Sequence, residues 1–285
     1  MSTSTLSAGE KSDRAPEQRA RFADLIAAEW IKVRSLRSTY WVLGLSALAA
    51  IAINVNAVHS DLLYIGRPQP DGSPPVKYDP LWHGLNIIAA DLMTLAAASF
   101  GAITVFGEYA TGMIRTTFAA VPDRRAVITA KVALVTAITL VLGAIVSTTS
   151  FFVTNAMLAP HHVGLSIHDP GCARAVVAYA LIVPVCALIG MALGTVLRHA
   201  TASITAVVGK LFILPLLFGG DRYKLFKEIG NYLPLNAESR LTLNPHGQAH
   251  LGRYPATITG SWIALAAWAL ASVIVAVVVV RRRDV

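Results

Sequence analysis

The sequence predicts an all-α protein that crosses a membrane six times. Only 14% of its 285 residues are charged, whereas soluble domains carry about 25%. The mean hydropathy is +0.58, and several apolar runs approach the roughly 20 residues that a helix needs to cross the hydrocarbon core. The net charge of +8 is therefore interpreted as a signal of membrane topology and not as a nucleic-acid footprint.

The predicted spans are separated by stretches rich in proline, glycine and polar residues. The connection over residues 59–82 contains GRPQPDGSPPVKYDP and has no helical pattern, which is typical of a loop. Residues 219–257 form the longest connection, and within it RYKLFKEIGNYL has apolar residues at helical spacing. We place the spans at about 40–58, 84–106, 126–153, 173–197, 200–218 and 258–280.

An amphipathic helix is expected just before the first span. Residues 1–20 are polar and are expected to form a disordered cytoplasmic tail. Residues 21–39 place apolar side chains on one face, as in a helix that lies at a membrane surface. Glu29 falls inside this apolar stripe, so it either pairs with Lys32, points to water, or meets a protein partner.

A basic, polar segment at residues 106–131 separates the second and third spans. It reads FGEYATGMIRTTFAAVPDRRAVITAK. Glu108 ends the first apolar run, Pro122 and Asp123 predict a turn, and Lys131 lies one turn into the next apolar run. A short, weakly amphipathic stretch lies in its middle.

The distribution of basic residues places both termini in the cytoplasm. The positive-inside rule assigns Lys-rich and Arg-rich short loops to that side. The N-terminal region, the segment at 106–131, the turn at Arg198 and the C-terminal Arg281–Arg283 all lie on one side, whereas the two shorter loops opposite hold only Arg67 and Lys77.

No sequence motif for catalysis or nucleotide hydrolysis is present. The pair Gly209-Lys210 is followed by leucine and has no glycine-rich loop before it, so it is not a phosphate-binding loop. Patterns of the GxGxxG, HExxH and GxSxG types are also absent. We therefore expect no enzyme activity and no cofactor in this chain.

EYATGMIRTTFAAVPDRRAVITAK resembles the loop after the second span in type-2 permeases of ABC transporters, especially actinobacterial ones. Met113 stands where that family usually has threonine. The start AAEWIKVRSLRSTYW and the ending RRRD resemble the family's N-terminal interface helix and its C-terminus. The resemblance covers residues 40–285 as one six-span permease domain together with the helix before it.

The resemblance implies an ATP-driven exporter whose ATPase is a separate cytoplasmic subunit that holds ATP and Mg²⁺. A second permease chain, identical or related, would complete the transporter. The segment between the second and third spans would be a coupling helix that docks on the ATPase. Residues implied in docking are Glu108, Tyr109, Gly112, Arg115, Pro122, Arg124, Arg125 and Lys131, and those of the interface helix are Glu29, Trp30, Lys32 and Arg34.

Asp91 and Lys210 are the ionisable residues predicted to lie deepest in the spans. Such residues are costly in a membrane and usually pair with each other or line a cavity. The alternatives are that Asp91 reaches water at the outer surface and that Lys210 extends its ammonium toward the interface. The sequence leaves both interpretations open.

Other features give weaker predictions. Cys172 and Cys186 are expected to be free thiols. The histidines at 161, 162, 168, 246 and 250 have some metal-like spacing, but loop histidines are usually plain polar residues, and no metal is predicted. An ion-gradient-driven transporter or channel, or a membrane-embedded enzyme, remains the alternative function. The substrate, whether drug, antibiotic, lipid or peptide, is not predicted.

Overall fold

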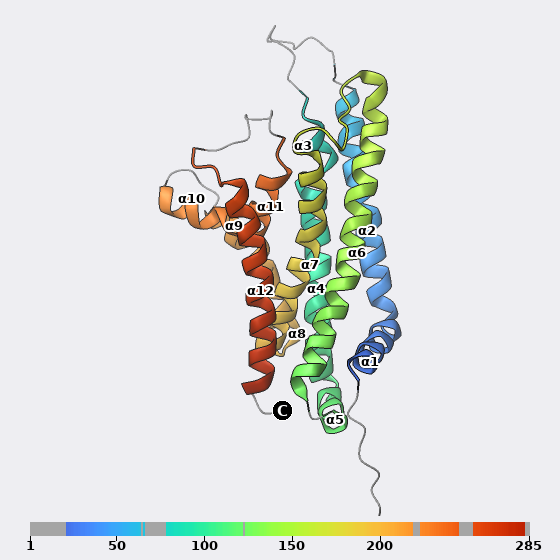
Figure 1. Cartoon of the computed structure of the whole chain (residues 1–285), viewed down its shortest axis with the longest axis vertical. Helices are drawn as coiled ribbons and strands as arrows, with labels where there is room; N and C mark the ends of the chain where they lie inside the picture. The colour runs from blue at the N-terminus through green and yellow to red at the C-terminus, as the bar shows by residue number, and fades with distance from the viewer. Residues whose placement is uncertain are drawn as a thin grey trace, which may run out of the picture.

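The computed structural model describes residues 21–63, 65, 78–121, 123–218, 223–244 and 253–282, and within these ranges all regular structure is helical. Six helical segments are long and apolar enough to cross a membrane. Figure 1 shows them as a bundle along the long axis of the molecule, with α1 and α5 at one end and α10 and α11 toward the other. Their bounds are Arg37–Leu62, Pro80–Ala110, Arg124–His161, Cys172–Leu197, Ala200–Phe218 and Ile258–Val280.

Each of the six predicted spans overlaps one of these helical segments, and several segments extend beyond the predicted ends. The first is α2 (Arg37–Leu62), and the second consists of α3 (Pro80–Gly84) and α4 (Ile87–Ala110). The third is α6 (Arg124–Leu158), which the Asp123 carboxylate caps by accepting hydrogen bonds from two backbone amides, as N-cap residues do. The fourth is α7 (Cys172–Leu197) and the last is α12 (Ile258–Arg282). Hydropathy located the cores of the spans but not their polar, capped ends.

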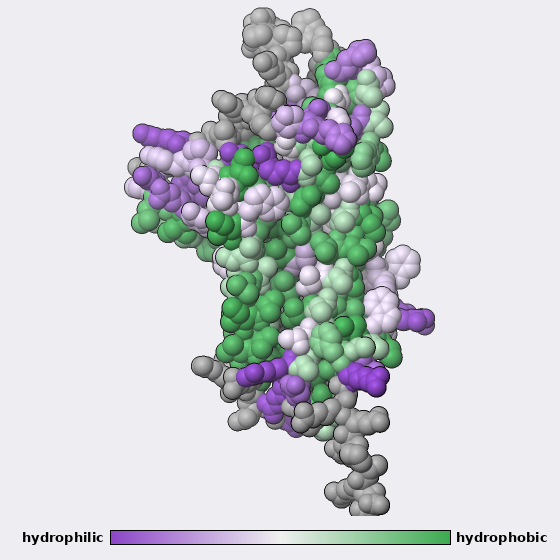
Figure 2. Space-filling view, viewed as in Figure 1, coloured by the Kyte–Doolittle hydropathy of each residue, from purple (hydrophilic) through white to green (hydrophobic). Residues whose placement is uncertain are grey.

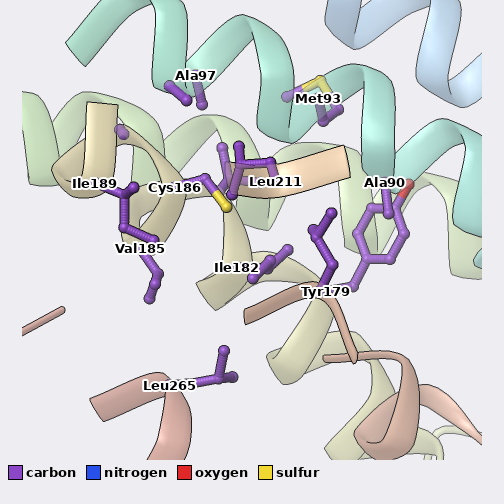
Figure 3. Close-up of a cluster of buried hydrophobic side chains, with 14 of the residues drawn as sticks. Ala90, Met93, Ala97, Tyr179, Ile182, Val185, Cys186, Ile189, Leu211 and Leu265 are labelled. Carbon is purple, nitrogen blue, oxygen red and sulfur yellow. The ribbon is translucent and has the colours of Figure 1, made fainter. Parts of the chain in front are cut away.

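Helix α7 forms the centre of the bundle, and it packs against α4, α6 and α12. In the most apolar 18-residue stretch of α7, 83% is buried, compared with 17% in the corresponding stretch of the fifth span. Figure 3 shows the resulting core, in which Tyr179 and Cys186 of α7 lie with Met93 of α4, Leu211 of the fifth span and Leu265 of α12. Both cysteines are buried free thiols, as predicted.

Small residues let α4 and α7 approach closely. A Cβ placed on Gly190 would lie 1.9 Å from the Ala98 carbonyl oxygen, and one placed on Gly101 would lie 1.9 Å from the Ala187 carbonyl oxygen. No side chain fits at these distances, so the glycines set the separation of the two helices. This contact joins the second span firmly to the centre of the bundle.

The fifth span is the least covered and the least regular. It consists of α8 (Ala200–Val208), a π-helical turn at Gly209–Ile213 and α9 (Leu214–Phe218). The π turn precedes Pro215, whose missing N–H relaxes the ordinary hydrogen-bond ladder. Leu216 and Leu217 are 81% and 68% exposed, so this span presents a bare apolar face.

Two short helices lie between the fifth and sixth spans. Helix α10 (Lys224–Asn231) projects sideways from the bundle in Figure 1, and α11 (Pro234–Thr242) packs on α7 and α12. The Arg174 guanidinium of α7 donates hydrogen bonds to the carbonyls of Leu241 and Leu243, which holds the end of α11 in place. The predicted helical spacing here is confirmed for α10, whereas Leu233 lies in the turn before α11.

Candidate functional site

Helix α1 (Phe22–Ser35) lies against the bundle at the end that carries α5 (Met113–Ala120), as Figure 1 shows. Its buried residues are Leu25, Glu29 and Val33, which are spaced by four residues and so share one face. The apolar residues at its two ends, Phe22 and Leu36, are 48% and 41% exposed and do not belong to this face. The buried face therefore carries a carboxylate at its centre, packed chiefly against α6.

Glu29, Lys32, Glu108 and Lys131 form a closed cycle of alternating charges, here called the charge ring. The Lys32 ammonium donates to Glu29 Oε1 at 2.7 Å and to Glu108 Oε1 at 2.8 Å. The Lys131 ammonium donates to Glu29 Oε2 and, at 2.9 Å, to Glu108 Oε1. The ring thus joins three elements that are distant in sequence: α1, the end of α4 and the beginning of α6.

The charge ring is neutral and mostly hidden from water. Glu29, Glu108 and Lys131 are 3–5% exposed, and the two carboxylates balance the two ammonium groups. Burial by itself lowers the pKa of Lys32, but the hydrogen bonds and negative charges of Glu108 and Glu29 outweigh it and hold this pKa above its ordinary value. Lys32 is therefore charged throughout the physiological range of pH.

Helix α5 is attached to the same ring. Gly112 precedes it with φ 71°, a left-handed conformation that glycine adopts without cost, so the chain turns sharply out of α4. The Lys32 ammonium lies 3.4 Å from the hydroxyl of Thr117 in α5. Ile114 is the buried residue of this helix. The Arg124 guanidinium lies 5.2 Å from the centre of the Phe118 ring. Helix α5 is therefore held from both of its flanks.

Hydrophilic residues gather at this end of the molecule, as the purple colour at the lower end of Figure 2 shows, and several of the solvent-facing ones are arginines. Arg34, Arg115 and Arg125 are exposed, and Arg124 is half-buried. A groove of 210 Å³ lies between α1 and α5, beside the ring. Its lining residues are Leu25, Ala28, Glu29, Lys32, Thr117, Ala120, Val121 and Val127.

The predicted docking residues divide into two groups. Glu108 and Lys131 lie inside the charge ring and are not available to a docked partner, whereas Arg115 and Arg125 are accessible. The Arg198 guanidinium lies over the Tyr109 ring, 4.6 Å from the ring centre. This contact links α4 to the turn after α7. Trp30 is 44% exposed. Pro122 lies outside the described residues.

The structure does not pair Asp91 with Lys210. No ion pair joins them in the part of the chain that the structure describes. The Lys210 ammonium instead lies 3.4 Å from the centre of the Trp268 ring, an arrangement that favours the cation electrostatically. Asp91 is half-buried on α4.

The structure contains a buried acid that the sequence analysis missed. Glu238 on α11 is 3% exposed, and no hydrogen bond or ion pair to its carboxylate occurs among the described residues. Burial, with a smaller contribution from the negative charge of Asp91, raises its pKa to about 8. The signal was available, because Glu238 lies midway between Leu235 and Leu241 on one helical face.

The described residues include no group of three or more His, Cys, Asp or Glu side chains that could hold a metal ion. His246 and His250 lie outside the described residues. Neither family models nor curated proteins show any match to this chain. A functional proposal therefore depends on the site itself and on the resemblance of residues 106–131 described above.

Proposed function

We propose that this chain is the permease subunit of an ATP-driven ABC exporter, with ATP hydrolysed on a separate cytoplasmic subunit. The observation that carries the proposal is the charge ring, which binds α1, α4, α5 and α6 into one unit at the basic end. A partner that pushes on α5 would thereby move the second and third spans together, as in a rigid-body transition.

The basic surface supplies the contact with the ATPase in this proposal. Arg115 and Arg125 present guanidinium groups that pair with carboxylates in two-point contacts. The groove beside the ring receives a side chain of the partner. Glu108 and Lys131 act indirectly, because they hold α5 and α1 in the orientation that the partner recognises.

The transporter would be a pair of permease chains. Only 17% of the most apolar 18-residue stretch of the fifth span is buried, and a second chain would bury the exposed face. The substrate path would run between the two chains, along the second and fifth spans. The substrate class is not specified by these features, so drug, antibiotic, lipid and peptide export remain candidates.

Co-purification tests the proposal. The full chain is purified in mild detergent from its native membrane, and a stoichiometric soluble ATPase is expected with it. Changing Arg115 and Arg125 together to Glu should reduce ATPase recovery by at least roughly tenfold, because two attractive contacts of exposed side chains become repulsive. Membrane insertion and yield of the chain should not change.

A matched control separates docking from overall charge. Changing Lys224 and Lys227 to Glu alters the net charge equally but at the opposite end of the molecule, so ATPase recovery should equal that of the wild type. An intact wild-type preparation without an ATPase, or equal recovery with the two arginines reversed, would contradict the proposal.

An ion-gradient-driven transporter is the second candidate, and Glu238 favours it. A buried carboxyl group that is largely protonated at neutral pH is the kind of group that carries protons in secondary transporters. In liposomes with an imposed pH gradient, this candidate predicts proton uptake that Glu238→Gln abolishes. Under the ABC proposal the gradient alone drives no uptake in either protein.

A further inference from the structure

An apolar groove runs between α10 and the outer half of α12. It encloses 470 Å³, within the roughly 300–1,000 Å³ of typical small-molecule sites. Alanines at 264, 267 and 271 form its floor because they follow one another along one face of α12. Ile229, Tyr232, Leu233, Ile263 and Trp268 complete the lining, so every lining residue is apolar or aromatic.

A polar pocket of 350 Å³ adjoins the apolar groove and shares Tyr232 with it. Its lining includes Glu228, Asn231 and Thr257, together with the chain at Pro255, Ala256 and Gly260. Two hydrogen bonds fix the boundary between the two parts. The Trp268 indole N–H donates to the Tyr232 carbonyl at 2.8 Å, and the Asn231 amide donates to the Tyr254 carbonyl at 2.9 Å.

The two parts follow one another along the axis of α12. The polar pocket lies at the first residues of α12, and the apolar groove follows from Ile263 to Ala271. At 1.5 Å per residue, the groove extends from about 8 Å to about 20 Å below the start of the helix. A molecule that fills both parts must therefore have a polar end at the membrane surface and an apolar end inside the hydrocarbon layer.

Helix α10 has the character of a helix in the headgroup layer. Lys224 and Glu228 lie one turn apart on its polar side, with the ammonium 3.7 Å from the carboxylate, and both are exposed. Leu225, Phe226 and Ile229 are exposed as well, at 46–67%. Figure 2 shows that the underside of this projection is hydrophobic. Such helices rest on the boundary between headgroups and acyl chains.

We propose that this composite groove binds a phospholipid of the outer leaflet whose headgroup carries both a phosphate and a primary ammonium. One acyl chain would lie between α10 and α12. The ammonium would meet Glu228 and the phosphate would meet Lys224, because this exposed pair of opposite charges matches the zwitterion. The proposal does not depend on which energy source drives the protein.

Native mass spectrometry of the full chain tests this site. The protein is transferred from detergent into mixtures of phosphatidylethanolamine and phosphatidylglycerol, and the wild type is expected to retain one phosphatidylethanolamine. Ala267→Phe fills the groove and should reduce retention at least roughly tenfold, a loss that equals about 1.4 kcal/mol of binding free energy. Ala271→Leu, a smaller obstruction at the deep end, should reduce retention in the same direction.

Ala266→Phe is the matched control. Ala266 is also exposed on α12 but does not line the groove, so lipid retention should equal that of the wild type. Glu228→Gln should lower the preference for phosphatidylethanolamine over phosphatidylglycerol. Equal retention in Ala267→Phe and the wild type overturns the proposal. If Ala267→Phe instead dissociates an oligomer without loss of lipid, the groove is an interface between two copies and the lipid proposal is wrong.

Discussion

Lys131→Met is expected to destabilise the folded chain by about 3–5 kcal/mol, the range found when one partner of a buried ion pair is removed. Glu29 and Glu108 would then face each other with only Lys32 to balance them, at 3% and 5% exposure. Thermal unfolding in detergent, followed by circular dichroism, measures the effect. The first contacts to open should be those of α1 with α6, detected as faster proteolysis within residues 21–36.

A double change distinguishes loss of charge balance from loss of packing. Glu29→Gln together with Lys131→Met leaves Glu108 with Lys32 and restores neutrality, so its cost should be clearly smaller than the sum of the two single changes. Lys224→Met serves as the control, because its ion pair is exposed and should change stability by less than about 1 kcal/mol. Strictly additive losses would contradict a cooperative ring.

If the proposed function holds, ATPase binding and stability should be separable. Lys131→Met loosens α1 and α5 without changing the exposed arginines, so ATPase binding should weaken only to the extent that α5 loses its fixed orientation. Reversal of Arg115 and Arg125, which are both exposed, should instead eliminate docking and leave the unfolding temperature almost unchanged, because substitutions of accessible charges away from buried networks are usually within about 0.5 kcal/mol. The two variants therefore test different parts of the proposed mechanism.

Hydropathy predicted the six spans because the cost of exposing peptide groups to lipid leaves the helix as the only open-chain solution. It could not place their ends, since those depend on caps such as Asp123 and on local turns such as Gly112. The break at Leu85 between α3 and α4 was missed for the same reason.

Parts of the charge ring were visible in the sequence as anomalies. Glu29 interrupts an apolar stripe, Glu108 ends an apolar run, and Lys131 lies one turn into the next. Pairing of Glu29 with Lys32 was one of the stated alternatives, and it occurs. That Glu29 also meets Lys131, 102 residues later, could not be predicted because it depends on how α1 folds back onto α6.

For Asp91 and Lys210, the sequence showed that the residues are unusual but not what they contact. Asp91 and Lys210 were conspicuous because each interrupts an apolar run, but span sequences alone do not determine which helix faces which. The structure places Lys210 against Trp268. Glu238 was overlooked because its segment, PLNAESRLT, is polar enough to be typical of a surface loop. The spacing of Leu235, Glu238 and Leu241 indicates a shared helical face, but it does not show that this face packs on α7 and α12, and that tertiary contact buries the acid.

Glu238 should make the protein less stable as pH rises through the neutral range. Its pKa is about 8 in the folded protein, against an ordinary value of 4.5. Between these values the folded chain holds a proton that the unfolded chain has released, so the free energy of unfolding falls with rising pH. The decline should begin above about pH 4.5 and level off above about pH 8, where both states are ionised.

Glu238→Gln isolates this contribution, because glutamine resembles the protonated acid and does not titrate. The unfolding temperature of the wild type should fall between pH 6 and pH 8.5 relative to that of Glu238→Gln, with histidines and other groups contributing equally to both proteins. Glu228→Gln, in the exposed part of the same outer region, should follow the wild-type curve. Glu238 interacts electrostatically with Asp91 of α4 and with Tyr179 and Cys186 of α7, and Arg174 donates its hydrogen bonds to the carbonyls at the end of α11. None of these groups supplies a positive charge that would stabilise the ionised carboxylate. Parallel curves of unfolding temperature against pH for Glu238→Gln and the wild type would therefore mean that water reaches this acid. That result would also contradict a proton-carrying role for Glu238.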